Sequence, residues 1–136
     1  MAPSLLDIRV VGTSRIPSVL LVDDESSVLE LLGQLFSALG ISRVRRASSA
    51  EEALRILQAE QFAIIVSDYR LEGMDGVAFV EQLRATGDKT PVLMLSGAPD
   101  KMGVIRAARQ PAVDFFPKPF EIRQLIGAME RLAEAA

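Results

Sequence analysis

Short apolar runs alternate with longer segments of helical periodicity along most of this sequence, and the alternation constrains the fold more than any other feature. Runs rich in valine, isoleucine and leucine occupy residues 19–22, 62–66, 92–95 and 113–116, with a shorter run around Val44. Between the runs, apolar residues recur at the spacing of one face of an amphipathic helix. Repeated strand–helix units of this kind predict a parallel sheet that helices cover on both faces.

The order of these units predicts a doubly wound α/β fold. Strict alternation of strands and helices suits a three-layer (βα)5 sandwich of the flavodoxin-like class, with a parallel sheet in the order 2-1-3-4-5. Right-handed crossovers would place the second and fifth strands at the edges. Arg43, Arg45 and Arg46 in the second strand suit an edge, as does Pro117 at the end of the fifth, because charge and proline oppose pairing with further strands.

The length of 136 residues predicts one domain. We expect that domain to cover residues 18–136, after an amino-terminal extension over residues 1–17. In the extension, Leu6, Ile8 and Val10 alternate with polar residues, and a period of two is compatible with a strand that pairs with a sheet edge. A mobile tail or a linker is at least as good an interpretation.

The composition narrows the chemistry that this sequence can perform. Cysteine and histidine are both absent, so disulfides, thiolate nucleophiles and histidine-based triads or metal sites are excluded. A net charge of -3 argues against direct nucleic-acid binding, and no apolar run approaches the roughly 18 residues of a membrane span. We therefore expect a cytoplasmic protein whose acid, base or metal chemistry rests on carboxylates, hydroxyls and lysine.

Polar residues follow the predicted strands at their carboxyl ends, which is where open α/β sheets form ligand sites. They are Asp23 and Asp24 after the first strand, Asp68 at the end of the third, Ser96 at the end of the fourth and Lys118 after the fifth. Each one alone is more often a solvated loop or cap residue. Carboxylates gathered at one edge repel each other unless a cation is present, so we interpret the group as one site.

Carboxylates without histidine or cysteine indicate a site for a hard cation. Mg²⁺ is expected, because it typically combines one or two carboxylates with water and phosphate oxygens. A carboxylate beside the metal can attack a phosphoryl group and form an aspartyl phosphate. Lys118 and Ser96 would supply a point charge and a hydroxyl donor for that transfer.

Four segments resemble response-regulator receiver domains of two-component signalling systems, including the chemotaxis regulators. They are Leu21-Val-Asp-Asp-Glu25, Asp68 followed by Gly73-Met-Asp-Gly76, Ser96-Gly97-Ala98, and Phe115-Phe-Pro-Lys-Pro-Phe120. The resemblance extends over nearly all of residues 18–136. It implies a phosphorylation-dependent signalling module, with no enzymatic activity beyond Mg²⁺-dependent self-phosphorylation from a phospho-donor and autodephosphorylation.

The resemblance implies a role for each matched acidic residue. Asp68 would be the phosphoacceptor. Asp23, Asp24 and Asp68 would hold Mg²⁺ together with the backbone carbonyl of Arg70.

The resemblance also implies that three residues nearer the carboxyl end respond to phosphorylation. Ser96 and Lys118 would contact phosphoryl oxygens, and Phe115 would occupy the position of the aromatic ring whose rotamer follows the movement of Ser96. Simple core packing is the alternative interpretation of Phe115. The family also commonly has a cis peptide at the position of Lys118-Pro119.

Two positions depart from the commonest family pattern. Glu72 stands where many relatives have proline, in the glycine-containing loop that runs from Asp68 to Gly76, and Pro111 stands where glycine usually precedes the last strand. Neither belongs to the acidic group, so we expect an effect on loop kinetics and not on phosphorylation.

The resemblance also implies partners. The phosphoryl donor would be a histidine kinase or a histidine phosphotransfer protein, since this sequence has no histidine of its own. We expect no output domain, so a downstream protein contact or a further phosphotransfer would carry the signal, in a monomer or a phosphorylation-dependent dimer. The output surface would be formed by the fourth helix, the fifth strand and the fifth helix, including Lys101, Arg106, Arg109 and Phe115.

Two other functions are weaker interpretations. A phosphatase with Asp68 as nucleophile generally has a second acid two residues later, and this position is Arg70. A flavodoxin-like binder of small ligands needs a phosphate-cradling loop after the first strand, where residues 23–25 are all acidic and would repel phosphate without a metal.

Overall fold

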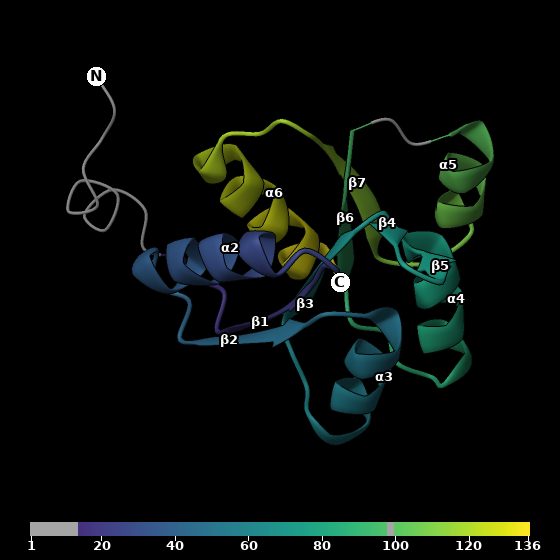
Figure 1. Ribbon diagram of the computed structural model, residues 1–136, viewed down its shortest axis with the longest axis horizontal. Helices are drawn as coiled ribbons and strands as arrows, with labels where there is room; N and C mark the ends of the chain where they lie inside the picture. The colour runs from purple at the N-terminus through teal and green to yellow at the C-terminus, as the bar shows by residue number, and fades with distance from the viewer. Residues whose placement is uncertain (1–13, 98–99) are drawn as a thin grey trace.

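The computed structural model describes residues 14–97 and 100–136 (Figure 1). The strand considered around Leu6, Ile8 and Val10 lies outside the described residues. No helix among the described residues is long and apolar enough to cross a membrane.

A parallel sheet of five strands forms the centre of the molecule, in the order β2-β1-β3-β6-β7. The strands are β1 (Ser18–Val22), β2 (Arg43–Ala47), β3 (Ile64–Asp68), β6 (Val92–Ser96) and β7 (Val113–Pro117). This is the predicted 2-1-3-4-5 order, with β6 and β7 as the fourth and fifth strands. The arginine-rich β2 and the proline-ended β7 lie at the two edges, as predicted.

Helices cover both faces of the sheet and complete the three predicted layers. They are α2 (Ser26–Ala38), α3 (Ala50–Ala59), α4 (Gly76–Ala85), α5 (Lys101–Ala108) and α6 (Ile122–Ala135). In Figure 1, α2 and α6 lie on one face, whereas α3, α4 and α5 lie on the other. The flavodoxin-like fold class is therefore confirmed.

The core is divided into two hydrophobic clusters, one on each face of the sheet. Successive residues of a strand point to opposite faces, so Ile64 and Val66 enter the cluster with α2 and α6, while Ile65 enters the other. Phe36 from α2 and Phe79 from α4 are fully buried, one in each cluster. Burial on both faces explains why the central strands β1, β3 and β6 are continuous apolar runs instead of alternating ones.

A short hairpin follows β3, where the sequence predicted only a loop. Its strands are β4 (Arg70–Leu71) and β5 (Met74–Asp75), which pair antiparallel. Gly73 turns the chain between them with a φ of 86°, a conformation that favours glycine. Strands of two residues are too short to produce a detectable period, so the sequence pattern could not reveal them.

The last residues of the expected extension pack against the domain. The Ser14 amide donates a hydrogen bond to the carbonyl of Leu39 at 2.8 Å, and the Arg43 amide donates to the carbonyl of Pro17 at 3.2 Å. Ile16 is buried in the cluster that α2 and α6 form.

Candidate metal and phosphate site

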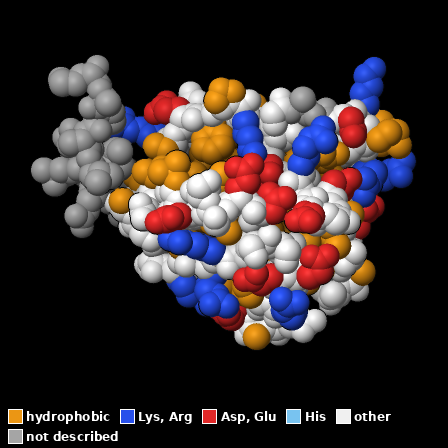
Figure 2. All heavy atoms as spheres, viewed as in Figure 1, with side chains coloured by type: hydrophobic (Ala, Val, Ile, Leu, Met, Phe, Trp, Pro, Cys, Tyr) orange, Lys and Arg blue, Asp and Glu red, His pale blue; other side chains and the backbone are white. Residues whose placement is uncertain are grey.

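Three carboxylates lie together at the carboxyl end of the sheet. Asp23 and Asp24 follow β1, and Asp68 ends β3, which is hydrogen-bonded to β1 with Val22 opposite Ser67. Asp23, Asp24 and Asp68 each offer one oxygen atom within 4.8 Å of the other two. The parallel pairing of β1 and β3 therefore produces the convergence that the sequence predicts. In Figure 2, acidic side chains gather near the centre of the face shown, with basic side chains beside them.

Asp23 is the buried member of the acidic group, with a relative exposure of 5%. Burial raises the pKa of its carboxyl from 3.8 to about 6, and the negative charge of Asp68 adds to the rise. A hydrogen bond from the Glu25 amide and the positive charge of Lys118 lower the pKa and oppose the shift. The Glu25 amide donates to Asp23 Oδ1 at 2.9 Å. The ionised form of Asp23 is thus unfavourable in this surrounding, and a bound cation would stabilise it.

Lys118 contacts the acidic group directly. Its Nζ donates a hydrogen bond to Asp68 Oδ1 at 2.9 Å, and the Asp68 side chain is mostly buried, with 14% exposure. Lys118 follows β7, and its backbone amide donates to the Ser96 carbonyl at 3.0 Å. The Lys118-Pro119 peptide is cis, as expected.

Two serines lie at the ends of the central strands beside this site. Ser96 ends β6 and is 5% exposed. Among the described residues its hydroxyl has no hydrogen bond to the three carboxylates, so the link to the site runs through its carbonyl and Lys118. Ser67 is fully buried, and its hydroxyl donates to the Asp68 carbonyl at 3.0 Å. Ser67 was not among the predicted site residues, because its position at the end of an apolar run indicates only a strand.

Arg70 lies in the hairpin that leaves the site. It begins β4 two residues after Asp68 and stands opposite Asp75 of β5, while its side chain is exposed.

An aromatic pair lies next to the site in sequence, on the face of the sheet that α3, α4 and α5 cover. Tyr69 follows Asp68 directly and is 4% exposed, and its ring centroid lies 5.7 Å from that of Phe115 in β7. Phe115 is half-buried and packs against the cluster that contains Tyr69. Burial raises the pKa of the Tyr69 hydroxyl, and the charges of Asp100 and Asp75 add to the rise. Tyr69 was not among the predicted site residues, although its place directly after Asp68 in the sequence is a signal that could have indicated it.

A groove also lies elsewhere on the molecule. It has a volume of about 830 Å³ and lies between α3 and α4, near Phe62 and Thr90, which precede β3 and β6. The amino ends of the strands form this part of the molecule, whereas the acidic group lies at the carboxyl ends. None of the three carboxylates lines the groove.

The donor set of the acidic group fits a hard divalent cation. The ligands are carboxylate oxygens, which Mg²⁺ prefers, and one of them is held in a buried position that disfavours its charge. Lys118 adds a single positive charge beside three carboxylates, so the group retains negative charge for a cation to neutralise. Mg²⁺ bound here could also take phosphoryl oxygens among its ligands, since it usually keeps part of its coordination shell for water and phosphate.

Comparison with known proteins gives one consistent family. Residues 19–130 match the Response regulator receiver domain family. The response regulator protein TodT of Pseudomonas putida is 32% identical over 124 residues, which cover 91% of this chain and 54% of TodT. The C4-dicarboxylate transport transcriptional regulatory protein DctD of Rhizobium meliloti is 33% identical over 121 residues, covering 89% of this chain and 26% of DctD.

Solved structures agree with the sequence relatives. The chemotaxis response regulator CheY4 of Vibrio cholerae superimposes with a TM-score of 0.75 at 28% identity, covering 86% of this chain and 98% of CheY4. The chain thus covers nearly all of the CheY4 chain but only about half of the length of TodT.

Proposed function

This chain belongs to the response regulator receiver domain family of two-component signal transduction, and from that premise we propose that Asp68 is the residue on which it is phosphorylated. A receiver domain is a phosphorylation-activated signalling module and not a classical enzyme. One observation carries the assignment of Asp68: its carboxylate belongs to the acidic group and also contacts the Lys118 ammonium at 2.9 Å. A phosphoryl group on Asp68 would therefore meet positive charge from Lys118.

The transfer is a substitution at phosphorus. One Asp68 carboxylate oxygen forms a bond to the phosphorus atom while the phosphorus–nitrogen bond of a phosphohistidine breaks. The electron pair of that bond stays with the imidazole nitrogen of the donor, which then takes up a proton. The Lys118 ammonium stabilises the negative charge on the phosphoryl oxygens during the transfer. The burial of Asp68 limits the access of water that would compete with its carboxylate for the phosphoryl group.

Mg²⁺ is the proposed cofactor, and it would neutralise the phosphoryl oxygens when bound. Asp23, Asp24, Asp68 and the backbone carbonyl of Arg70 would hold it. Support comes from the oxygen-only donor set and from the burial of Asp23, which raises the pKa of its carboxyl and makes the ionised form less favourable without a bound cation.

The proposed switch runs from the site to the α5-β7-α6 surface. Ser96 would contact a phosphoryl oxygen, and Phe115 would follow the movement of Ser96, since β6 and β7 are adjacent strands. The output surface includes Lys101, Arg106, Arg109 and Phe115, and α5 exposes apolar side chains on it.

The partners belong to the proposal as well. Receiver domains take their phosphoryl group from histidine kinases; for this chain we include a histidine phosphotransfer protein as an alternative donor. The domain would cover residues 18–136, act in the cytoplasm as a monomer or a phosphorylation-dependent dimer, and signal through a protein partner.

Acetyl phosphate with Mg²⁺, followed by intact-mass measurement, tests the acceptor. Wild type should gain one phosphoryl group, whereas Asp68→Asn should gain none, because an amide is a poor nucleophile. Asp114→Asn is the matched control: Asp114 is exposed on β7, and its carboxylate accepts a hydrogen bond from the Phe115 amide at 2.8 Å, which asparagine can also do. Phosphorylation of Asp68→Asn at the wild-type rate would assign the acceptor to another residue.

A further inference from the structure

Helix α5 is held on the molecule by unusually little apolar packing. Of its eight residues, only Gly103 and Ala107 are buried. Its larger apolar side chains point outward, with exposures of 64% for Met102, 44% for Val104 and 47% for Ile105. Hydrophobic burial therefore contributes little to the position of α5, and a few specific contacts must define it.

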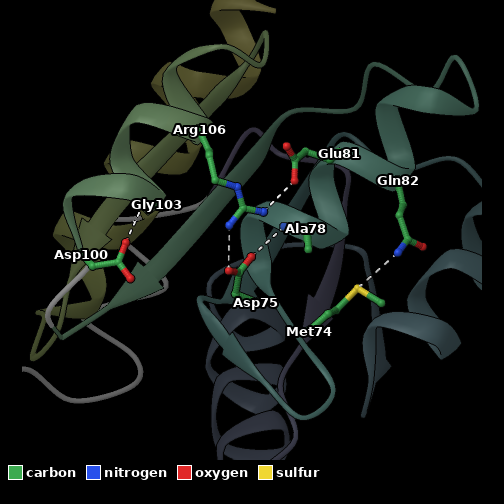
Figure 3. Close-up of polar contacts among 8 residues, drawn as sticks. All are labelled: Met74, Asp75, Ala78, Glu81, Gln82, Asp100, Gly103 and Arg106. Carbon is green, nitrogen blue, oxygen red and sulfur yellow. Dashed lines mark hydrogen bonds and ion pairs between the residues drawn. The ribbon is translucent and has the colours of Figure 1, made fainter.

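Arg106 makes the most specific of these contacts. Its Nη1 donates to Asp75 Oδ2 at 3.0 Å, and its Nη2 donates to Glu81 Oε1 at 2.6 Å. Figure 3 shows the guanidinium of Arg106 reaching from α5 between these two carboxylates, one at the start of α4 and one within it. The side chain of Arg106 is 31% exposed, so solvent screens these ion pairs only partly.

Asp75 connects this contact to the acidic site. Its Oδ1 accepts a hydrogen bond from the Ala78 amide at 2.7 Å and caps α4, which leaves Oδ2 for Arg106. The same residue belongs to β5 and stands opposite Arg70 of β4. Arg106 therefore holds the closing end of the hairpin whose opening strand contains the proposed carbonyl ligand of Mg²⁺.

Tyr69 gives a second, independent connection between α5 and the site. Its hydroxyl lies directly beneath Gly103, where a Cβ atom would overlap it. The Asp100 side chain caps the same turn of α5 by accepting from the Gly103 amide at 2.6 Å, as Figure 3 shows. The carbonyl of Tyr69 also accepts from the Gly76 amide at 2.6 Å, at the end of the hairpin. Both ends of α5 thus rest on the segment that follows Asp68.

We propose that Arg106 is a positioning residue that couples α5 to Mg²⁺ binding by holding Asp75, and with it the hairpin that contains Arg70. The inference rests on the proposed metal site. Coupling is reciprocal, so a partner that displaces α5 would change Mg²⁺ affinity, and Mg²⁺ would stabilise α5 in its described position.

The test measures Mg²⁺ binding and helix protection in the same variants. Tyr69 is the single tyrosine of a protein without tryptophan, so intrinsic fluorescence during a MgCl₂ titration reports on this region alone. Hydrogen exchange of the α5 amides gives the second measurement. Arg106→Gln should weaken Mg²⁺ binding about 3- to 10-fold and speed exchange in α5. Arg106→Lys should restore part of the affinity, because an ammonium reaches one carboxylate at a time.

Two further variants distinguish coupling between α5 and the Mg²⁺ site from a simple loss of α5 stability. Glu81→Ala removes the α4 contact but keeps the Asp75 contact, so it should speed α5 exchange and leave Mg²⁺ affinity unchanged. Arg55→Gln on the exposed side of α3 is the matched control and should change neither measurement. Faster α5 exchange in Arg106→Gln with Mg²⁺ affinity equal to wild type would overturn the proposal.

Failure of the underlying metal site would look different. Asp24→Asn removes a proposed ligand and should weaken Mg²⁺ binding whatever Arg106 does. If wild type gives no saturable response to MgCl₂, or if Asp24→Asn binds as well as wild type, the metal site itself is wrong. A change in Asp24→Asn without a change in Arg106→Gln would overturn only the coupling.

Discussion

At the scale of single residues, Asp23 is a buried carboxyl whose ionised form a bound cation would stabilise. Its carboxyl is withdrawn from solvent and faces Asp68, and burial raises its pKa to about 6. A carboxyl whose folded-state pKa lies above the unfolded value binds its proton more tightly when folded. Its contribution to stability is therefore fully present below pH 3.8 and is lost as the pH rises through about 6.

We predict that this loss is visible in the metal-free protein. Between pH 4 and pH 6.5 in the presence of a chelator, Asp23 should reduce the free energy of unfolding by about 2–3 kcal/mol. Urea unfolding of wild type and Asp23→Asn across this range isolates the effect, because asparagine does not titrate. Mg²⁺ should stabilise wild type more at pH 7.5 than at pH 5, since it binds the ionised carboxylate. Identical pH profiles in the two proteins would show that Asp23 titrates normally.

At the scale of secondary-structure elements, α5 differs from α6 in how each accommodates a glycine. Gly103 lies in α5 with the Tyr69 hydroxyl against it, whereas Gly127 lies in α6 with the nearest obstacle to a Cβ atom at 3.3 Å, on the flexible Arg131. Glycine inside a helix normally costs about 1 kcal/mol relative to alanine. Substitution by alanine should therefore raise the free energy of unfolding at Gly127 and lower it at Gly103.

We predict that Gly127→Ala stabilises the protein by up to about 1 kcal/mol and that Gly103→Ala destabilises it by about 1–3 kcal/mol. Urea unfolding gives both values. The cause can be checked in a double-mutant cycle: Tyr69→Leu removes the hydroxyl and the ring, so Gly103→Ala should be less harmful in that background. If Gly103→Ala were as favourable as Gly127→Ala, the tyrosine could not occupy the place assigned to it.

At the scale of the whole molecule, stability is unevenly distributed. The central strands β3 and β6 are buried almost throughout and contribute to both hydrophobic clusters. Helix α5 and the edge strand β7 are only partly buried. Most of the stabilisation from apolar burial therefore comes from the central strands, and little comes from the α5-β7-α6 surface that we propose contacts the partner.

We predict that hydrogen exchange follows this division. Amides of β3 and β6 should exchange only through global unfolding, with a free energy near that measured in urea, whereas α5 amides should exchange several-fold faster through local opening. Added Mg²⁺ should slow exchange in α5 if the Arg106 coupling holds. Exchange at one common rate across β3, β6 and α5 would indicate a single cooperative unit instead.

Much of the architecture was determined by the sequence alone. Continuous apolar runs such as Ile64–Val66 specify strands buried on both faces, and helical periodicity between them leaves the parallel doubly wound sheet as the natural arrangement. Once the strand order is known, Asp23, Asp24 and Asp68 must meet, because β1 and β3 are neighbours that point the same way. The candidate site could be predicted for the same reason: residues at strand ends are located by topology.

Other features were decided only by tertiary packing. Three of them depend on how closely the helices approach the sheet and each other. They are the burial of Asp23, the position of the Tyr69 hydroxyl under Gly103 and the ion pair between Arg106 and Asp75. Such distances arise from side chains far apart in the sequence, and no local period encodes them. The sequence therefore determined which groups gather at the acidic edge, while the tertiary structure decided how tightly that edge is connected to α5.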